Sequence, residues 1–371
     1  MPTITRIAFF NPTAQIGGAE RNLLVMCQAL KDRGIACIVV LPPKGTLVDA
    51  LQGMGIPTIS FPETELKSGQ ILRVLWNCLR LWPRLRRFKP QLLHANSIFG
   101  MYLPVILGAV TRLPSVVHWA DFDTRVGDIQ LIKVTAPRNR VIAVSEAIRD
   151  TLTTAGAKSN TITVIHNGSP TPDPSSDSRV DIAAEFSISA DDLWVGITGR
   201  IDDWKGHVHL IDAMSQLKNL AIHLIILGGG NGRHSDFEAG IHRQVIELGL
   251  SDRITFIGFQ ADPSRIVRCL DIVICPSDYE PFGLVATEAM ALAKPVIASA
   301  TGGFLETVIP DKTGILVPTK SPDDLAVAIR RLATDADLRH TMGIGGYHRY
   351  LDRFSVRPFI DSIIAHYNRT L

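Results

Sequence analysis

Two glutamates in the last third of the chain lie in a loop and a following helix, where their carboxylates could contact a ligand. Glu280 follows a strand-like run, residues 271–275, and Glu288 lies inside a predicted helix that runs to Ala293. Gly283 leaves the intervening turn without a side chain, so backbone N–H groups at the helix start can face an anion. Residues 294–298 are predicted to be the next buried parallel strand. Loops between such strands and helices are where open parallel sheets bind ligands.

Two basic residues occupy a comparable place earlier in the chain. Arg200 and Lys205 flank a short loop after a predicted strand, residues 193–198. Arg can bind a pyrophosphate through its planar fork and Lys as a point charge. Two solvated surface cations are the alternative interpretation.

Two further motifs in the first half could contact a ligand. Gly17 and Gly18 lie between a predicted strand, residues 6–10, and a predicted helix, residues 19–33, which directs backbone amides and a positive helix end at one point. The dinucleotide-binding pattern Gly-x-Gly-x-x-Gly is absent here. His118 ends a predicted strand, residues 115–119, and is expected to point toward a ligand crevice. A plain strand–helix turn and a packed histidine are the alternatives.

Strands and helices alternate along the whole chain, which predicts parallel sheets with helices on both faces. At 371 residues the chain is long enough for two domains, and residues 169–178, with three prolines and no apolar face, are predicted to link them. Residues 1–168 carry 19 basic and 10 acidic side chains, whereas the remainder carry 19 and 26. This asymmetry favours two domains with different partners.

Composition excludes several classes of protein. Hydrophobic residues make up 46% of the chain, no apolar run reaches membrane-spanning length, and the first residues lack the features of a signal peptide. Five cysteines without a Cys-x-x-Cys motif indicate neither a zinc ribbon nor a disulfide framework, and they fit a reducing cytosol. A cytoplasmic protein is expected.

One segment, residues 67–89, carries seven basic residues and no acidic one. Its larger apolar side chains fall on roughly one helical face: Ile71, Leu72, Leu75, Trp76, Leu79 and Trp82. Tryptophans beside arginines suit a membrane interface with anionic headgroups. A crossover helix with a solvated basic end explains the pattern equally well, and no motif accompanies the charge that would indicate nucleic acid.

The paired glutamates resemble the motif of the retaining GT-B glycosyltransferases of family 4. The flanking Pro281-Phe282-Gly283, the helical run 288–291 and Lys294-Pro295-Val296 make this resemblance specific, and it extends over nearly the whole chain. It implies an α/β fold of two Rossmann-like, doubly wound parallel-sheet domains that face each other across a cleft. Residues 1–168 would form the acceptor-side domain, with a helix in residues 355–371 packed back on it. Residues 169–354 would form the nucleotide-sugar domain.

The resemblance also implies roles for single residues. Arg200 and Lys205 would stabilise the leaving diphosphate, Glu288 would hold the ribose, and Glu280 would bind the sugar hydroxyls or a developing positive charge. His118 would contact the sugar or the acceptor, and Gly228 and Phe259 would lie near the nucleoside and its base. The implied donor-binding set is Gly17, Gly18, Arg200, Lys205, Gly228, Phe259, Glu280, Phe282, Gly283, Leu284, Val285 and Glu288, with no metal ion and no other cofactor.

We therefore expect a retaining, metal-independent transferase that moves a hexose-type sugar from a UDP- or GDP-sugar. The acceptor would be a glycan or a lipid-linked molecule of surface polysaccharide synthesis, and the basic segment would contact the inner face of an anionic membrane. A sugar-nucleotide epimerase of the same fold and a non-catalytic nucleotide-sugar-binding protein are the alternatives.

Overall fold

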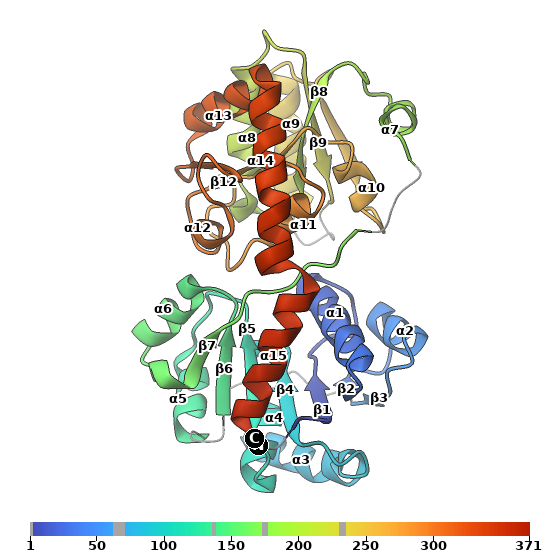
Figure 1. The fold of residues 1–371 in the computed structure, drawn as a ribbon, viewed down its shortest axis with the longest axis vertical. Coiled ribbons are helices and arrows are strands. Elements are labelled where there is room, and N and C mark those ends of the chain that lie inside the picture. The colour runs from blue at the N-terminus through green and yellow to red at the C-terminus, as the bar shows by residue number, and fades with distance from the viewer. Residues whose placement is uncertain (1–2, 62–70, 136–138, 173–176, 230–234) are drawn as a thin grey trace. The chain divides into compact units, whose positions relative to one another are not determined.

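The structure is a computed structural model that describes residues 3–61, 71–135, 139–172, 177–229 and 235–371 (Figure 1). The chain divides into two compact units. Unit 1 comprises Met1–Ser169 and Val356–Leu371, and unit 2 comprises Pro170–Ser355. The predicted domain boundaries each lie one residue away from these.

Unit 1 is built on a parallel sheet whose described strands follow the order β3-β2-β1-β4-β5-β6-β7. The strands are β1 (Arg6–Phe10), β2 (Ala36–Leu41), β3 (Thr58–Ser60), β4 (Leu92–Ala95), β5 (Ser115–Trp119), β6 (Asn139–Ala143) and β7 (Ile162–Val164). They are short and apolar because both faces of a parallel sheet are covered by helices. The order reverses beside β1, which pairs with both β2 and β4.

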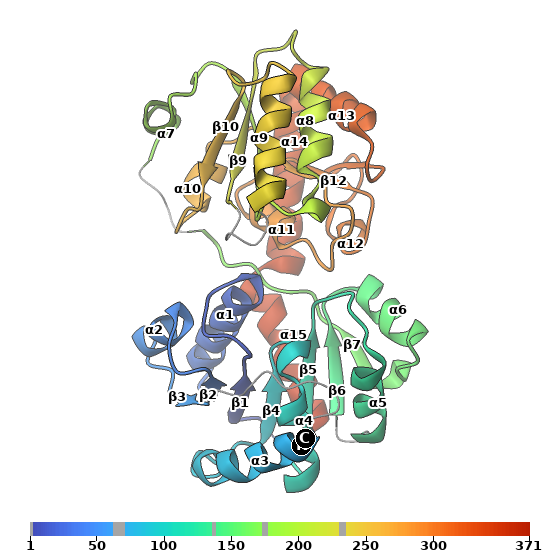
Figure 2. The same cartoon turned by 180° about the vertical axis from the view of Figure 1, so that it is seen from behind.

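Alternate residues of the unit 1 strands enter two separate cores. Phe9 and Val39 belong to the core under α1 (Gly18–Asp32), α2 (Thr46–Gly53) and α15 (Val356–Thr370). Phe10 and Val40 belong to the core under α3 (Ile71–Leu85) and α4 (Tyr102–Thr111), two helices that lie side by side (Figure 2). This is the alternation that a strand requires when both its faces are buried. The remaining elements of the unit are η1 (Ile98–Gly100), α5 (Val126–Thr135), α6 (Glu146–Thr154) and η2 (Ser159–Thr161).

The last helix of the chain, α15, belongs to unit 1 although it follows all of unit 2 in the sequence. Phe359, Ile360, Ile363 and Tyr367 are buried in the same core as α1. Figure 1 shows α15 crossing one face of the unit 1 sheet. The apolar face of this helix therefore packs in the core of unit 1.

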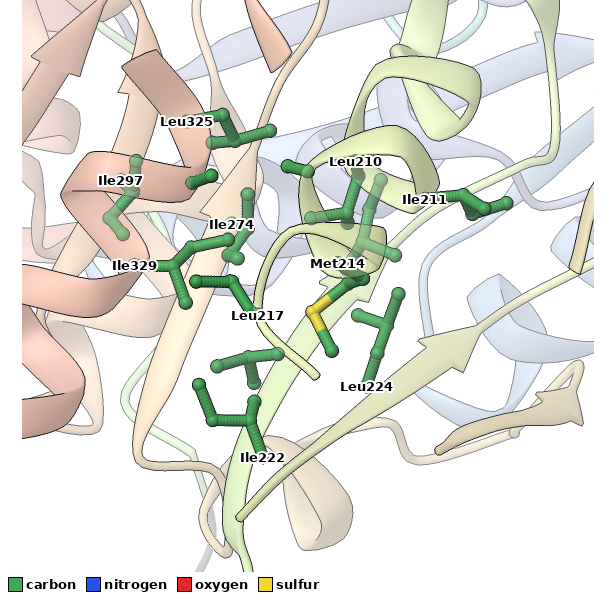
Figure 3. Close-up of a cluster of buried hydrophobic side chains, with 14 of the residues drawn as sticks. Leu210, Ile211, Met214, Leu217, Ile222, Leu224, Ile274, Ile297, Leu325 and Ile329 are labelled. Carbon is green, nitrogen blue, oxygen red and sulfur yellow. The ribbon is translucent and has the colours of Figure 1, made fainter. Parts of the chain in front are cut away.

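Unit 2 repeats the architecture with the strand order β10-β9-β8-β11-β12-β13. Its strands are β8 (Leu193–Thr198), β9 (Ile222–Leu227), β10 (Ile254–Gly258), β11 (Ile272–Cys275), β12 (Val296–Ser299) and β13 (Gly314–Val317). Its helices are α7 (Arg179–Phe186), η3 (Asp203–Lys205), α8 (His207–Ser215), α9 (Ser235–Glu247), α10 (Ser264–Val267), α11 (Leu284–Ala291), α12 (Phe304–Thr307), α13 (Pro322–Thr334), α14 (Ala336–Arg349) and η4 (Tyr350–Phe354). Figure 3 shows part of its core, where α8 and α13 direct apolar side chains at the sheet.

The helix predicted to run to Ala293 ends earlier. Helix α11 stops at Ala291, and Ala293 has a left-handed backbone with φ of +54°. Pro295 disfavours helical geometry at the residue before it, so the chain turns here into β12. Among the described residues, no helix is long and apolar enough to cross a membrane.

Candidate functional site

Lys205 and Glu280 form an ion pair at the carboxyl ends of two neighbouring strands. Lys205 ends η3 after β8, and Glu280 lies in the loop after β11, the strand that pairs with β8. Their Nζ and Oε2 atoms are 2.8 Å apart, and both side chains are largely buried. Partial burial strengthens such a pair because little water screens it. Lys205 and Glu280, which the sequence predicts as separate ligand-binding residues, are therefore direct partners in an ion pair.

The loops that carry this pair are fixed against each other by backbone and ring contacts. Gly206 has φ of +75°, and a Cβ there would lie 2.0 Å from the Pro276 carbonyl oxygen. The Asp278 amide donates to the Trp204 carbonyl oxygen at 2.8 Å. The Trp204 ring stacks on Tyr279 with centroids 4.9 Å apart, and the Lys205 ammonium lies 4.0 Å from the Trp204 centroid. Contacts from both loops thus fix the position of the Lys205 ammonium group.

Glu288 belongs to the same group of charges. Cys275 ends β11, and burial raises the pKa of its thiol to about 12, with smaller contributions from Glu280 and Glu288 that Lys205 opposes. These three side chains consequently lie close enough to Cys275 for their charges to act on it. Glu288 is half-buried on α11, which packs against β11 and β12.

The start of α11 is shaped by two glycines. Gly283 has φ of +92°, and a Cβ there would lie 2.5 Å from the Phe304 ring. Gly303 donates from its amide to the Glu280 carbonyl oxygen at 2.8 Å, and its own Cβ would collide with Phe282. The helix therefore begins directly after Gly283, four residues beyond Glu280, and its first amides belong to Leu284 and Val285. The Phe282 side chain is buried, with its ring 6.0 Å from Phe354.

Arg200 also has a carboxylate partner. It lies in the loop after β8, is more than half exposed, and contacts the buried Asp202 at 3.0 Å. The two predicted diphosphate-binding cations thus each belong to an ion pair. An anion that binds here would take over part of the interaction that each carboxylate now provides.

The remaining residues of unit 2 that were predicted to contact the donor lie at the ends of β9 and β10. Gly228 follows β9 with φ of +110°, and a Cβ there would lie 2.0 Å from the Gly199 carbonyl oxygen. Its amide donates to the Gly258 carbonyl oxygen at 2.8 Å, which joins the ends of β9 and β10. Phe259 follows immediately and is 79% exposed. An exposed ring at a strand end suits stacking on a flat ligand.

In unit 1, the glycine pair begins α1, but one of its amides is already engaged. The Gly17 amide donates to Glu20 Oε2 at 3.1 Å. Glu20 is buried and also accepts from Asn11 Nδ2 at 3.2 Å, and Asn96 Nδ2 donates to Asn11 Oδ1 at 2.8 Å. This network was not predicted, since Asn11 and Asn96 are 85 residues apart in the sequence and neither belongs to a motif.

His118 lies on β5 as predicted, and it is buried and hydrogen-bonded. Its Nε2 is 3.0 Å from Asn167 Oδ1, which also accepts from Asn22 Nδ2 at 3.2 Å. Burial lowers the pKa of His118 to about 4, although the Asn167 hydrogen bond opposes this shift. His118 is therefore neutral near pH 7 and donates through Nε2–H. Its Nδ1 has no hydrogen-bond partner among the described residues.

Further histidines surround His118. The His94 ring lies 5.7 Å from the His118 ring, and its Nδ1 is 2.8 Å from the Tyr367 hydroxyl on α15. Burial lowers the pKa of His94 well below its usual value and that of His366 to about 4. The cluster joins β4, β5 and α15, and no sequence motif could have indicated it.

Unit 2 also holds charged side chains that the sequence did not single out. Asp278 lies 3.7 Å from His209 Nε2 and 3.4 Å from Lys320 Nζ. His207, next to Gly206, is buried, and its pKa falls to about 4 chiefly through burial and then through the Lys205 charge. Within the described parts of the chain, no group of three or more His, Cys, Asp or Glu side chains is arranged to hold a metal ion.

Known protein families match both halves of the chain. Residues 179–349 match the model described as Glycosyl transferases group 1, and residues 16–171 match Glycosyltransferase Family 4. A D-inositol 3-phosphate glycosyltransferase of Mycobacteroides abscessus is 34% identical over 197 residues, which cover 51% of this chain and 42% of that protein. The match thus spans less than half the length of that relative. The lipopolysaccharide core biosynthesis glycosyltransferase LpsE of Rhizobium meliloti is 25% identical over 94% of this chain and 95% of its own.

A solved structure matches the whole fold. The crystal structure of Anabaena Alr3699/HepE in complex with UDP and glucose has a TM-score of 0.87 and 26% sequence identity, and the match covers 99% of this chain and 100% of that one. Two Rossmann-like parallel sheets flanked by helices, in the strand orders described above, are the GT-B architecture. The two family models together account for most of the sequence, and the chain belongs to glycosyltransferase family 4.

Proposed function

We propose that this protein is a retaining glycosyltransferase that moves a hexose-type sugar from a UDP- or GDP-sugar to a glycan or lipid-linked acceptor. The observation that carries the proposal is the Lys205–Glu280 ion pair, with Glu288 close by, at the carboxyl ends of β8 and β11. Cations, carboxylates and helix-start amides gathered at this edge of a parallel sheet are the groups that a sugar diphosphate needs. The related structure in complex with UDP and glucose supports the donor class.

The leaving diphosphate would exchange partners with the carboxylates. Lys205 and Arg200 would turn from Glu280 and Asp202 to the phosphate oxygens and take up the charge that develops as the glycosidic bond breaks. The Glu280 carboxylate, released from Lys205, would bind sugar hydroxyls or a developing positive charge. The first amides of α11 would add a positive dipole, and Glu288 would hold the ribose. None of these steps requires a metal ion.

Unit 1 would supply the acceptor side. Because the pKa of His118 is about 4, the neutral ring would act there by hydrogen bonding, with Nδ1 as the acceptor for a hydroxyl. Gly18 would contribute its amide, while the Gly17 amide would first have to leave Glu20. The lipopolysaccharide core relative supports an acceptor in surface polysaccharide synthesis.

A turnover assay tests this proposal against its alternatives. The protein is incubated with a panel of UDP- and GDP-sugars, with and without a lipid-linked or glycan acceptor, and the products are separated by chromatography. A transferase forms a glycosylated acceptor and the free nucleotide diphosphate. An epimerase would convert the donor alone into an isomer, and a binding protein would leave every donor intact.

Lys205→Ala is the variant for this assay. We expect kcat to fall by roughly 10²–10³-fold, the usual cost of removing one group that stabilises transition-state charge. Lys312→Ala, which removes an exposed lysine of the same unit, is the matched control and should keep full activity. Unchanged turnover in Lys205→Ala would remove the proposed phosphate role.

A further inference from the structure

Three buried polar side chains of unit 1 form a hydrogen-bonded chain that ends at His118. Asn22 lies on α1, Asn167 in the loop after β7 and His118 on β5, and none of them is more than 6% exposed. Asn22 Nδ2 donates to Asn167 Oδ1 at 3.2 Å, and His118 Nε2 lies 3.0 Å from the same oxygen. One amide oxygen therefore accepts from both of its neighbours.

The orientation of the Asn167 amide decides which nitrogen of His118 carries the proton. With Oδ1 toward the ring, Nε2 must be the donor, and Nδ1 keeps a lone pair that can accept a hydrogen bond from a hydroxyl. If the amide were turned over, its Nδ2 group would donate to Nε2, and the ring proton would move to Nδ1. A substrate hydroxyl could then no longer donate to Nδ1. The two amide orientations have nearly the same shape, so a further contact must select between them.

Asn22 selects the orientation of the Asn167 amide. Because the Nδ2 group of Asn22 donates to Asn167 Oδ1, turning over Asn167 alone would bring two NH₂ groups together, and neither could accept. The backbone of the Asn167 loop is packed as well, since a Cβ at Gly168 would lie 2.7 Å from the Phe359 ring on α15. The amide is therefore held by Asn22 and by the packing of its own loop.

The histidines around His118 carry no charge that could set its tautomer. The His94 ring on β4 lies 5.7 Å from the His118 ring, and its Nδ1 is 2.8 Å from the Tyr367 hydroxyl. His366 is buried on α15. Burial lowers the pKa of both His94 and His366, so both rings are neutral near pH 7. The polar contact that Nε2 of His118 makes is the one with Asn167.

Asn22 leaves one of its own polar atoms unsatisfied. Its Oδ1 is buried and has no hydrogen-bond partner among the residues that the structure describes. A buried oxygen without a partner lowers the stability of the folded chain, and an apolar side chain of similar size would avoid this cost. Asparagine at this position is therefore explained better by the group that it orients than by stability.

We propose that Asn22 is a positioning residue of the transferase: through Asn167 it holds His118 in the tautomer whose Nδ1 accepts a hydrogen bond from a substrate hydroxyl. This inference rests on the proposed function, because that function gives His118 its contact with the substrate. Asn22 acts without touching the substrate itself. Loss of its amide would leave Asn167 free to turn over and His118 free to carry its proton on either nitrogen.

Nitrogen NMR of the full chain with labelled histidines reads the tautomer without any substrate. The His118 signals are assigned by their loss in His118→Gln, and the chemical shift distinguishes a protonated from an unprotonated ring nitrogen. The wild type should carry the proton on Nε2 at pH 7. In Asn22→Leu, which removes the amide at similar volume, part of the population should carry it on Nδ1. The kcat/KM for sugar transfer should then fall roughly tenfold, about the worth of one hydrogen bond.

Two further variants complete the test. Asn22→Ala removes the same amide and takes the place of Asn22→Leu if circular dichroism shows that the leucine variant is not folded. Asn139→Ala is the matched control, because Asn139 is also buried, accepts from Ser115 Oγ and has an amide nitrogen without a partner among the described residues. Asn139 begins β6, and its loss should lower stability while the His118 tautomer and kcat/KM stay as in the wild type.

Three results would overturn the proposal. The first is a wild-type His118 that is protonated on Nδ1, and the second is a ring that stays protonated on Nε2 in both Asn22 variants. The third is a changed tautomer with unchanged kcat/KM. Absence of sugar transfer by the wild type would count against the proposed function instead, and the tautomer in the Asn22 variants would still show whether Asn22 orients His118.

Discussion

The pairing of Lys205 with Glu280 makes the two predicted donor-binding residues dependent on each other. Neither side chain is well solvated, so removal of one leaves the charge of the other partly buried and without its counter-ion. Effects of substitution at the two positions are therefore expected to be non-additive. In the proposed mechanism, the same pairing would hold the lysine charge in place until a diphosphate displaced the carboxylate.

His118 offers a second test at the scale of single residues. Asn167→Asp would place a carboxylate where a neutral amide oxygen now lies 3.0 Å from His118 Nε2. An opposite charge at this distance favours the imidazolium, so the pKa of His118 should rise from about 4, by roughly 1–3 units. If neutral His118 contacts the substrate, the acid limb of the kcat/KM profile should move to higher pH.

Asn160→Asp is the matched control for this change, because Asn160 is exposed in the same unit. It should leave the pH profile where it is, and circular dichroism at pH 7 should confirm that both variants are folded. NMR titration of the His118 ring gives the pKa independently of activity. If the pH dependence of kcat/KM stayed the same while the pKa of the His118 ring rose, His118 would be excluded from the reaction.

At the scale of elements, the geometry around α11 depends on a glycine in a backbone conformation that other residues avoid. Gly283→Ala would combine left-handed φ of +92° with a Cβ 2.5 Å from the buried Phe304 ring. We expect a loss of about 1–3 kcal/mol in the free energy of unfolding, measured in urea, since strain of this kind carries such a cost. Donor affinity should fall as well, because the helix start beside Glu280 would move.

Gly53→Ala is the control for this substitution. Gly53 ends α2, has no positive φ, and an added Cβ there would meet nothing within 4 Å. The free energy of unfolding of Gly53→Ala should be unchanged or higher by up to about 1 kcal/mol, because alanine favours a helix over glycine by about this amount. A stability of Gly283→Ala equal to that of the wild type would show that the turn tolerates a side chain.

Which elements could be predicted follows from their length and pattern. Apolar runs bounded by Gly, Pro or polar residues predicted β1, β5, β8, β11 and β12 to within two residues. Periodicity cannot detect helices as short as α10 and α12, which contain four residues each, or the single π turn of η4. For α3, the apolar residues alone could not reveal which face is buried, since both faces carry them.

At the scale of the whole molecule, buried histidines in both units predict a loss of stability in acid. His118, His207 and His366 each have a pKa of about 4 in the folded chain, below the usual 6.5. The unfolded chain therefore binds more protons between these values, and folding stability falls as the pH drops from about 6.5 toward 4. By pH 5 the expected loss is about 1–2 kcal/mol for each histidine.

Urea unfolding at pH 7 and pH 5 measures this loss. His118→Gln should reduce the difference between the two conditions, since it removes one of the titrating groups. His340→Gln, at an exposed position, should leave the difference unchanged. A free energy of unfolding equal at both pH values would contradict the assignment of these histidines as buried and neutral.

The overall fold could be predicted from the sequence more completely than the contacts within the site. The segment around Glu280 and Glu288 indicated the family, and alternating strands and helices indicated two parallel sheets. The ion pairs and amide networks could not be predicted, because Lys205 and Glu280 are 75 residues apart and Asn22 and Asn167 are 145 residues apart. Such pairs are created by tertiary packing and have no local signature.

Thermal unfolding with a panel of nucleotide sugars, in the presence and absence of EDTA, tests the central claim most directly. A ligand that binds the native state raises the melting temperature by mass action. We expect one nucleotide sugar to stabilise the wild type and Lys312→Ala, with or without EDTA, and to stabilise Lys205→Ala much less. Stabilisation that EDTA abolishes, that is equal in Lys205→Ala, or that no nucleotide sugar produces would contradict a metal-independent donor site built on Lys205 and Glu280.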